Sequence, residues 1–504
     1  MNLAGSTAPP PGGRTHTESR HASPRLLLLL LGLGVFIGTF DQTVVVTILP
    51  NLIKDLGLPV AHFGQATWIV NGYLLGYTVA MPIVGRLADV YGHVRLYLIS
   101  LAIFILGSAA VALAPNLGFL VAARTFQAVG GGGVLPVAMA IASDVLPRER
   151  RPLILGGLAA TNNASSLLGP LWGAAVVGIW SWRAIFWLNI PLVAPVLIAL
   201  PMLARQVSAR RSMAVDWTGA GLLTIAIGAG TVALTDDGAN PRPLLLSLGI
   251  AAVSLLCLIQ FVRHEWKSSA PMIQVQSFRQ HHFSAAMLMY FLIGGALITA
   301  LVDVPLMTDV LFAGSPLQGG LNLMRLLLLL PIGGVAGGLL STRIGYRATA
   351  VLGLLTALGG FFLIRAWPSI PSSGQLWSGL GLIGLGLGLC DAPIVSTVVD
   401  HSRSGERATA TALLLVVWTS GMIVGLALLG TQGLGSFNTQ AARLFREQGT
   451  QLQTTAIQHL MRQTFNATFI AAACALAVAL LFAVWLQPGR GSSIRWSTLT
   501  GLEE

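Results

Sequence analysis

Five charged side chains lie inside long apolar stretches of this 504-residue chain, where a charge is costly unless it has a function. They are Asp41, Arg124, Asp303, Arg325 and Asp391. A carboxyl group in such a place can take up and release a proton, and an arginine can hold it as an ion pair in between. The residue types therefore predict proton coupling or cation contact at membrane depth.

Depth along the apolar runs sorts these charges into sets. Asp41 lies nine residues before Pro50 and Arg124 lies seven after Leu117, which places them ~13 Å and ~10 Å from the same end of their runs. We expect these two to pair.

Asp303 and Arg325 occupy successive runs near one end, so they form a second candidate pair; the alternative is that either one reaches into the headgroup layer. Asp391 has no basic residue at its depth, and it is either a proton carrier or cation contact or a solvated carboxylate of a cavity wall.

The elements that must position these residues are membrane-spanning helices. Of the chain, 54% is hydrophobic and 9% is charged, against roughly 25% charged in a soluble domain. The apolar runs reach ~20 residues, enough to cross ~30 Å of hydrocarbon as a helix. The fold class is therefore all-α, an integral membrane protein with spans near 26–49, 66–86, 95–114, 117–142, 152–177, 184–204, 216–234, 243–263, 283–308, 318–342, 346–367, 374–399, 407–433 and 464–487.

The basic residues are distributed unequally between the two sides of these fourteen spans. Twenty of the 29 Lys and Arg residues fall on the side of the two termini and seven on the other, which places both termini in the cytoplasm. The net charge of +11 then reflects the orientation of the chain in the membrane, and it predicts no nucleic-acid partner.

A sequence repeat divides the chain into two halves of the same orientation. GRLADVYGHVR (85–95) recurs as GLLSTRIGYRA (338–348), with Gly85 matching Gly338 and Gly92 matching Gly345. The predicted organisation is a disordered cytoplasmic tail (1–25), a six-helix bundle (26–204), an inserted helix pair with its linker (205–282), a second six-helix bundle (283–487) and a cytoplasmic tail (488–504).

Several motifs make the chain resemble the major facilitator superfamily, in its fourteen-helix drug:proton antiporter branch. They are DQTVVVTILP (41–50), GRLADVYGHVR (85–95), RTFQAVGGG (124–132) and the Gly-Pro motif of the fifth span at Gly169 and Pro170. LVDV (301–304) and LPIGG (330–334) show a weaker resemblance to a mycobacterial branch that exports triacylglycerides with a lipoprotein partner.

The resemblance implies a bacterial plasma membrane as the location of the chain, and it assigns roles to the motif residues. It makes Gly85, Asp89 and Gly92 a cytoplasmic gate, although Val90 and Val94 replace the basic residues expected there. It gives Gly169 and Pro170 a role in gating, whereas small residues at this spacing equally suit plain helix packing.

The family's fold places the first and fourth helices at the central cavity, which makes Asp41 and Arg124 the leading coupling pair. Gln127, Asn162 and Asn163 are the candidate substrate-cavity residues. Many proton-coupled relatives carry an acid where these asparagines stand, and an amide can bind substrate but cannot carry a proton. Coupling would then rest on Asp41, Asp303 or Asp391, or be weak.

The predicted function is export of lipophilic drugs or lipids by alternating access, driven by a proton gradient and without a cofactor. The expected partners are the substrate, membrane lipids and an outer-side lipoprotein. A metabolite importer on the same scaffold and a non-transporting sensor or channel remain as alternatives. An enzyme is disfavoured, because the nine histidines and three cysteines form no metal-ligand pattern.

The longest predicted outer loop, 434–463, carries apolar residues at helical spacing among Gln and Arg. It is either an amphipathic extension that guides a lipid outward or a solvated connector.

Overall fold

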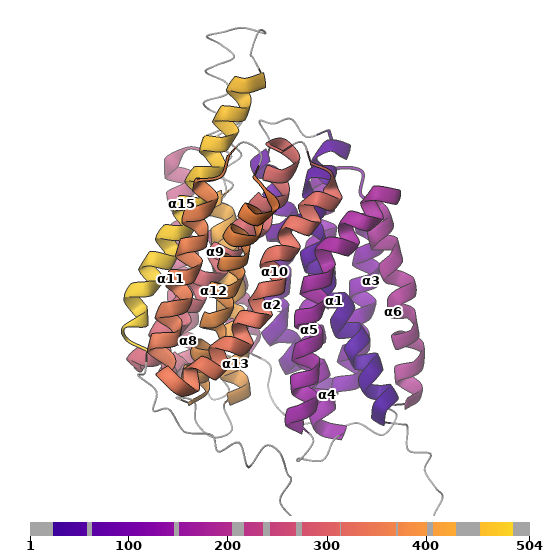
Figure 1. Cartoon of the computed structure of the whole chain (residues 1–504). Coiled ribbons are helices and arrows are strands. Elements are labelled where there is room, and N and C mark those ends of the chain that lie inside the picture. Colours follow the sequence, from indigo (N-terminus) through magenta and orange to yellow (C-terminus); the bar gives the residue numbers. More distant parts are fainter. Residues whose placement is uncertain are drawn as a thin grey trace, which may run out of the picture.

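The computed structural model describes residues 24–57, 63–145, 151–203, 216–234, 242–268, 275–312, 314–368, 371–400, 407–429 and 454–486. Within these ranges the chain forms fourteen α-helices and one short 3-10 helix, with no strand (Figure 1). The first bundle comprises α1 (Pro24–Asp55), α2 (Phe63–Tyr91), α3 (His93–Ala112), α4 (Leu117–Val145), α5 (Arg151–Ile179) and α6 (Arg183–Leu203). The inserted pair is α7 (Trp217–Leu234) and α8 (Leu244–Lys267), followed by η2 (Val275–Arg279). The second bundle comprises α9 (His281–Val310), α10 (Pro316–Ile344), α11 (Tyr346–Arg365), α12 (Ser373–Asp400), α13 (Arg407–Leu428) and α15 (Thr454–Ala483).

The predicted fold class is confirmed. Twelve helices of the described chain are long and apolar enough to cross a membrane, and two shorter apolar stretches, Ala164–Ile179 and Leu413–Leu428, complete the fourteen. The first two helices end later than expected, at Asp55 instead of 49 and at Tyr91 instead of 86. The largest difference in a boundary is at α15, which begins at Thr454, ten residues before the expected 464. Residues 454–463 are therefore the first turns of a helix rather than part of a loop, and 430–453 lie outside the described residues.

Successive helices run in opposite directions, so the bundle has two ends. We call them the Pro24 end and the Asp55 end, after the first and last residues of α1. Side-chain contacts agree with the alternation. At the Asp55 end, Arg183 at the start of α6 pairs with Asp55 at a distance of 2.5 Å. At the Pro24 end, Nδ1 of His282 at the start of α9 lies 2.6 Å from the carbonyl oxygen of Trp485, just after α15. Figure 1 shows α15 rising beyond its neighbours at the Asp55 end.

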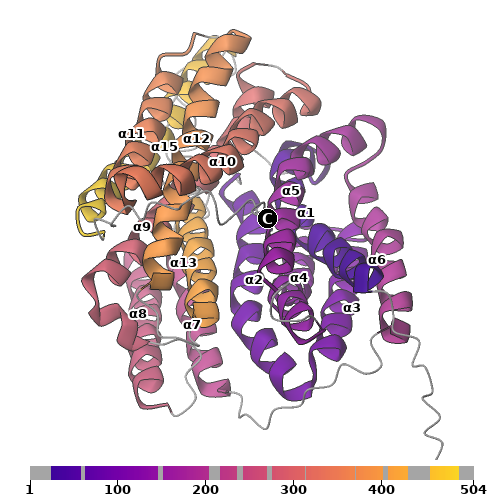
Figure 2. The same ribbon diagram turned by 60° about the horizontal axis from the view of Figure 1, so that its bottom comes forward.

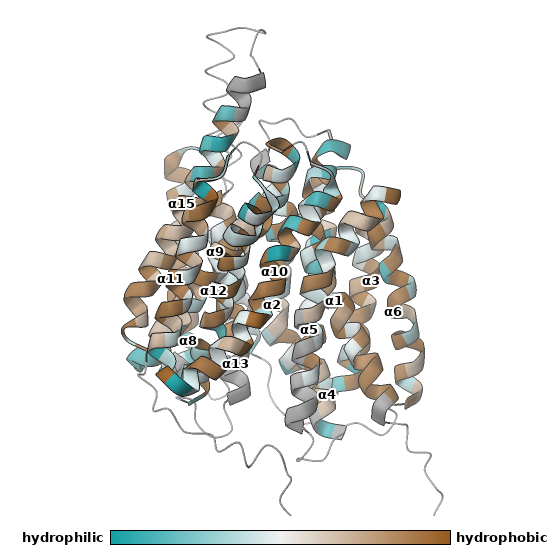
Figure 3. Cartoon of the chain, viewed as in Figure 1, coloured by the Kyte–Doolittle hydropathy of each residue, from teal (hydrophilic) through white to brown (hydrophobic). Residues whose placement is uncertain are grey.

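The two bundles lie side by side in Figure 2. Of the inserted pair, α7 contacts α2 of the first bundle and α13 of the second, and α8 packs against α7. Hydrophobic residues cover the outward faces of the helices in Figure 3. The inserted α8 is the most exposed of these helices. Only 6% of its most apolar 18-residue stretch is buried, and the side chain of Leu245, for example, is 84% exposed. Apolar surface of this extent requires lipid around it.

Glycine lets α12 pass between α10 and α11. A Cβ on Gly388 would meet the backbone of Leu330 in α10, and one on Gly386 would meet the backbone of Gly353 in α11. Such contacts bring helix backbones together, which replaces the missing hydrophobic driving force between helices in lipid. Asp391 comes directly after the glycine-rich stretch of α12, so this packing sets its position along the helix relative to α10 and α11.

The bundles pack together at their Asp55 halves. One apolar cluster combines residues of the second bundle with the Asp55 halves of α1 and α2, including Phe40–Ile53 of α1. A second cluster, from the Pro24 halves of α1 to α6, contains residues of the first bundle alone. The described contacts between the bundles therefore close the Asp55 end and continue to the middle of α2 and α13, where Met81 packs in one cluster with Val416 and Thr78 bonds Thr419 at 2.7 Å.

Candidate functional site

Asp41 and Arg124 form an ion pair in the interior of the first bundle. One Nη of Arg124 donates to Asp41 Oδ2 and also to Gln127 Oε1, the latter at 2.8 Å. Both charged side chains are about 1% exposed. Asp41 of α1 and Arg124 of α4 therefore lie at the same depth in the bundle, as counting residues along the sequence predicted.

Neighbouring helices complete the hydrogen bonding of the pair. Asn189 in α6 donates from Nδ2 to Asp41 Oδ1 and Ser108 Oγ, each at 3.0 Å. The guanidinium carbon of Arg124 lies 4.1 Å from the centre of the Tyr73 ring of α2, a cation–π geometry. Four helices, α1, α2, α4 and α6, therefore contact the carboxylate or the guanidinium, and α3 joins them through the bond of Ser108 to Asn189.

This arrangement has two chemical states. With Asp41 ionised, the pair is neutral overall and holds α1 to α4; with Asp41 protonated, the ion pair is lost and Arg124 keeps an uncompensated charge. Because burial makes an unpaired charge expensive, proton uptake must be accompanied by a rearrangement that gives Arg124 water or another partner. The two states therefore differ in whether an ion pair joins α1 to α4.

The predicted pair of Asp303 and Arg325 does not form. Asp303, 1% exposed, accepts from Thr468 Oγ1 of α15 at 2.5 Å. Arg325 donates to Asn322 Oδ1 at 2.5 Å and to Ser373 Oγ at 3.4 Å, and its guanidinium carbon lies 5.9 Å from the Trp377 ring. The two side chains point to different neighbours because α9 directs Asp303 toward α15, whereas α10 directs Arg325 toward α12.

Asp391 lies half-buried in α12 and accepts a hydrogen bond from Tyr290 of α9 at 2.7 Å. The Tyr290 ring packs against Trp418 of α13 with centroids 4.5 Å apart. Asp391 is thus the more accessible of the embedded acids, held by a hydroxyl and flanked by aromatic surface that suits a lipophilic or cationic group.

The three candidate substrate-cavity amides have different surroundings. Gln127 is 0% exposed and holds Arg124, so in this conformation it belongs to the ion-pair network rather than to a cavity wall. Asn162 is half-buried and its Oδ1 accepts from Thr39 of α1 at 2.6 Å. The side chain of Asn163 lies outside the described part of the chain.

The gate motif at the Pro24 end has a basic partner that the sequence reading missed. His93, the first residue of α3, places Nε2 3.1 Å from Asp89 Oδ1 of α2 and Nδ1 2.5 Å from Asp144 Oδ2 of α4. Two carboxylates facing both ring nitrogens suit the imidazolium, which donates from both. His93 supplies the positive charge that Val90 and Val94 lack. Its position in the motif, next to Gly92, is the feature of the sequence from which this role could have been predicted.

The repeat extends to this contact. Gly92 and Gly345 both have positive φ, 99° and 86°, which only glycine adopts readily. Each is followed by the first residue of a helix, and Tyr346 bonds Asp400 at 3.0 Å as His93 bonds Asp144. Both bundles therefore join their third and fourth spans at the Pro24 end through the first residue of the third span, which is histidine in the first bundle and tyrosine in the second. In the first bundle His93 also reaches Asp89 of the second span.

We expect replacement of His93 by Leu to slow transport by up to about fivefold. The variant leaves Asp89 and Asp144 without their common donor, and partly exposed pairs are worth up to about 1 kcal/mol each. His93→Arg keeps a cation there and should retain most of the rate. Transport rates of the purified variants in vesicles provide the measurement, and a wild-type rate for the Leu variant would contradict a gating role.

Gly169 and Pro170 pack α5 against α1 and also reach the second bundle. A Cβ on Gly169 would meet Thr43 and the Phe40 carbonyl of α1, so this glycine permits close helix approach. The Pro170 carbonyl lies against Gly320 of α10, where a Cβ would come within 2.8 Å of its oxygen. The motif therefore serves packing within the first bundle and contact between the bundles.

An ion pair joins the bundles at the Asp55 end. Lys54 Nζ of α1 lies 2.7 Å from Asp309 Oδ1 of α9. Each is the last residue but one of the first helix of its bundle, so the pair sits at equivalent positions of the repeat. Any motion that separates the bundles here must break this contact.

Comparison with known proteins identifies the fold and the class of protein. The family model of the Major Facilitator Superfamily matches residues 31–426. The chain belongs to the major facilitator superfamily. Within it, the chain is 36% identical over 440 residues to a triacylglyceride transporter of Mycolicibacterium hassiacum, covering 83% of this chain and 81% of that protein.

Other relatives carry the same description. A triacylglyceride transporter of Mycolicibacterium smegmatis is 35% identical over 82% of this chain and 76% of that protein. One of Mycobacterium tuberculosis is 33% identical over 84% of this chain and 85% of that protein. A solved bacterial homologue of the human lysosomal transporter Spinster, inward-facing and unoccupied, superposes with a TM-score of 0.63 at 17% identity, covering 93% and 99% of the two chains. As a member of this superfamily, the 504-residue chain is an integral membrane transporter rather than an enzyme.

Proposed function

We propose that this transporter exports triacylglyceride-class lipids by alternating access, with the Pro24 end in the cytoplasm. The relatives named as triacylglyceride transporters, which align over more than four-fifths of this chain, carry the substrate assignment. The excess of basic residues on the side of the termini supports the orientation.

The contacts between the bundles support alternating access. Closure at the Asp55 end rests on the shared apolar cluster, the Gly320 contact and the Lys54–Asp309 pair. At the Pro24 end the described apolar core of the first bundle is separate. A molecule loaded from the cytoplasmic side would leave when the Asp55 contacts break and the Pro24 ends meet.

We assign proton coupling to Asp41 with Arg124, because a buried ion pair between two helices must rearrange when its acid takes up a proton. Asp303 and Asp391 are the candidates in the second bundle. Triacylglyceride is insoluble in water, so its export needs an acceptor at the outer face, and we propose a lipoprotein in that role.

Reconstitution provides the test. Proteoliposomes containing the purified chain are loaded with labelled triacylglyceride or with a fluorescent lipophilic cation, and an acceptor lipid-binding protein is added outside. We expect an imposed pH gradient to raise the transfer of triacylglyceride and to leave the cation unmoved. Gradient-driven movement of the cation without movement of the lipid would instead indicate multidrug efflux.

A further inference from the structure

A basic surface lies at the Pro24 end of the inserted pair, where the end of α8 meets η2. Its cations are Arg263 and Lys267 of α8 and Arg279 of η2, and the three side chains are exposed. Two large aromatic side chains of the same segments are exposed as well, Trp266 at 50% and Phe278 at 38%. We call these five residues the α8–η2 surface.

The fold separates the charges of this part of the chain by sign. Phe261 and Glu265 are the buried residues of α8, and their spacing of four positions puts them on one face of the helix. Arg263 and Lys267, also four positions apart, lie on the opposite face. Glu265 is the only acidic residue of the sequence between Phe261 and Phe283, and it is 1% exposed. The acid is therefore turned into the protein and the bases are turned outward.

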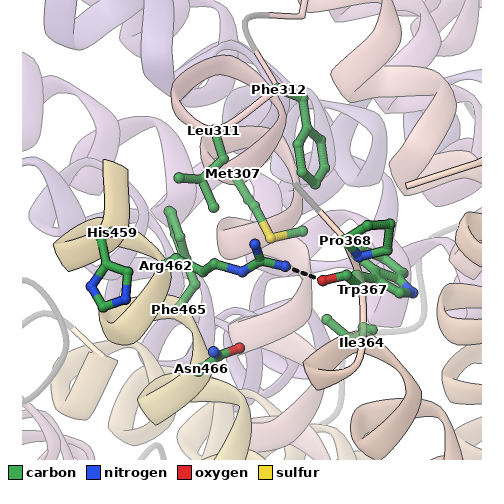
Figure 4. Close-up of a pocket in the computed structure, with 10 residues that line it drawn as sticks. All are labelled: Met307, Leu311, Phe312, Ile364, Trp367, Pro368, His459, Arg462, Phe465 and Asn466. Carbon is green, nitrogen blue, oxygen red and sulfur yellow. Dashed lines mark hydrogen bonds between the residues drawn. The ribbon is translucent and has the colours of Figure 1, made fainter. Parts of the chain in front are cut away.

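The three cations have no partner among the described residues. Asp216, the acid just before α7, is bonded to His264 Nε2 at 2.8 Å. At the opposite end of the molecule, by contrast, Arg462 donates to the Trp367 carbonyl across a cavity of about 230 Å³ (Figure 4). The cations of the α8–η2 surface form no such bond and no ion pair with any described side chain. Their positive charge is available to a molecule outside the chain.

Contacts with α9 set the position of η2. The Phe278 ring packs edge-on against the Phe283 ring with centroids 5.3 Å apart. Ser284 Oγ donates to the Phe278 carbonyl at 2.5 Å. Because η2 also contacts α8, Arg279 is held beside the basic end of that helix.

The α8–η2 surface lies at the depth of the lipid headgroups. From Leu244 to Val262, α8 carries no charge and spans ~28 Å, close to the ~30 Å of the hydrocarbon core. Arg263 and Lys267 follow directly. An exposed tryptophan at this depth, here Trp266, is typical of the membrane–water interface. Basic residues clustered next to a span attract anionic lipids.

We propose that the α8–η2 surface binds the headgroups of anionic phospholipids, with its three cations at the phosphates and its two aromatic rings at the start of the acyl chains. The bound lipids anchor η2, which connects the inserted pair to the second bundle, at the membrane surface. The assignment to the cytoplasmic leaflet rests on the orientation proposed above, whereas the binding itself does not.

Local fluorescence quenching in nanodiscs tests the surface. A fluorophore is attached to Gln280→Cys, an exposed position next to Arg279, in the full chain with its three native cysteines replaced. Phosphatidylglycerol and phosphatidylcholine, each carrying a nitroxide near the headgroup, are titrated in turn as quenchers. The measured quantity is the ratio of their apparent affinities for the labelled position. We expect a clear preference for phosphatidylglycerol that falls as salt is raised.

Paired substitutions show whether the named cations cause the preference. Each cation near an anionic surface is worth up to about a fivefold change in binding. Arg263→Gln/Lys267→Gln should therefore lower the ratio at least about fivefold, and adding Arg279→Gln should abolish the preference. Arg95→Gln/Arg343→Gln is the matched control, because it removes two exposed arginines from α3 and α10 at the same end. It should keep the wild-type ratio.

A wild-type ratio near one would overturn the surface, and so would a preference that neither salt nor the α8 substitutions reduce. The measurement involves no gradient and no transport, and the two leaflets of the nanodisc are alike. If labelling in cells places the Pro24 end outside while the preference and its variants behave as expected, the proposed orientation fails and the surface stands. Triacylglyceride export by a wild-type chain with a ratio near one would overturn the surface alone.

Discussion

Asp41→Asn should abolish the part of lipid export that an imposed pH gradient drives, and it should also lower the thermal stability of the protein. Asparagine has one acceptor oxygen where the carboxylate has two, so it can keep the bond from Asn189 or the bond from Arg124 in the present geometry, and it cannot take up or release a proton. The side chain of Arg124 is about 1% exposed, so the variant leaves a buried cation without its counter-charge. Breaking one partner of a buried pair costs about 3–5 kcal/mol.

A second variant separates the loss of coupling from the loss of stability. In Asp41→Asn/Arg124→Gln the buried cation is gone as well, so much of the stability should return, as it does when both partners of a buried pair become neutral. Gradient-driven export should stay absent, because no acid remains at the position. Unfolding temperatures in detergent and transfer rates in proteoliposomes are measured on the same preparations.

Asp55→Asn is the control on the same helix. Asp55 also pairs with an arginine, but its side chain is 46% exposed, and surface pairs are worth up to about 1 kcal/mol. This variant should therefore export and unfold nearly as the wild type does. Normal gradient-driven export by the double variant would exclude Asp41 from the coupling mechanism and move the assignment to Asp303 or Asp391.

The fold followed from the sequence because lipid leaves few choices. Backbone groups in hydrocarbon must be bonded within their own segment, so each apolar run of sufficient length becomes a helix. The ion pair of Asp41 and Arg124 could be anticipated for a similar reason: two embedded charges of opposite sign at equal depth lower each other's cost. Depth along a helix is readable from residue counting at a fixed rise.

Direction around a helix was not readable, and the Asp303–Arg325 prediction was wrong for that reason. Two residues at equal depth can still point in different directions around their helix axes. Those directions depend on how α9 and α10 are rotated against their neighbours. Thr468 and Asn322, which provide the actual partners, are neutral and drew no notice in the sequence. Neutral hydroxyl and amide partners leave no compositional signal, whereas an opposite charge does.

Contacts between the two bundles were likewise invisible, since they join residues that neither periodicity nor motif relates. Lys54 and Asp309 fall outside the spans expected at 26–49 and 283–308, and only the structure shows them together. His93 is the intermediate case, because its motif position indicated a gate while its two aspartate partners come from different helices. Such long-range pairs are where a single sequence carries least information.

The contact of Gly320 with α5 yields the second large effect: Gly320→Leu should reduce lipid export by at least about tenfold while the protein stays folded. A Cβ here would lie 2.8 Å from the Pro170 carbonyl oxygen and 3.0 Å from Ala174 Cβ, so a leucine has no room while the bundles touch. Overpacking of this kind costs about 1–3 kcal/mol. Because the contact joins two bundles, separating them relieves that cost without unfolding either bundle.

The expected consequence is a chain held open at its Asp55 end. Spin labels at Ile179 of α5 and Leu317 of α10, both exposed, report the separation in a background without Cys257, Cys390 and Cys474. Their distance distribution should shift to longer values in Gly320→Leu. Gly249→Leu is the control, since a Cβ on this α8 glycine meets nothing within 4 Å. An unshifted distribution together with normal export would show that α5 and α10 need not part and meet during transport. A shifted distribution with lost export would instead tie export to closure at this contact, because a cycle that cannot close one end cannot return for the next lipid.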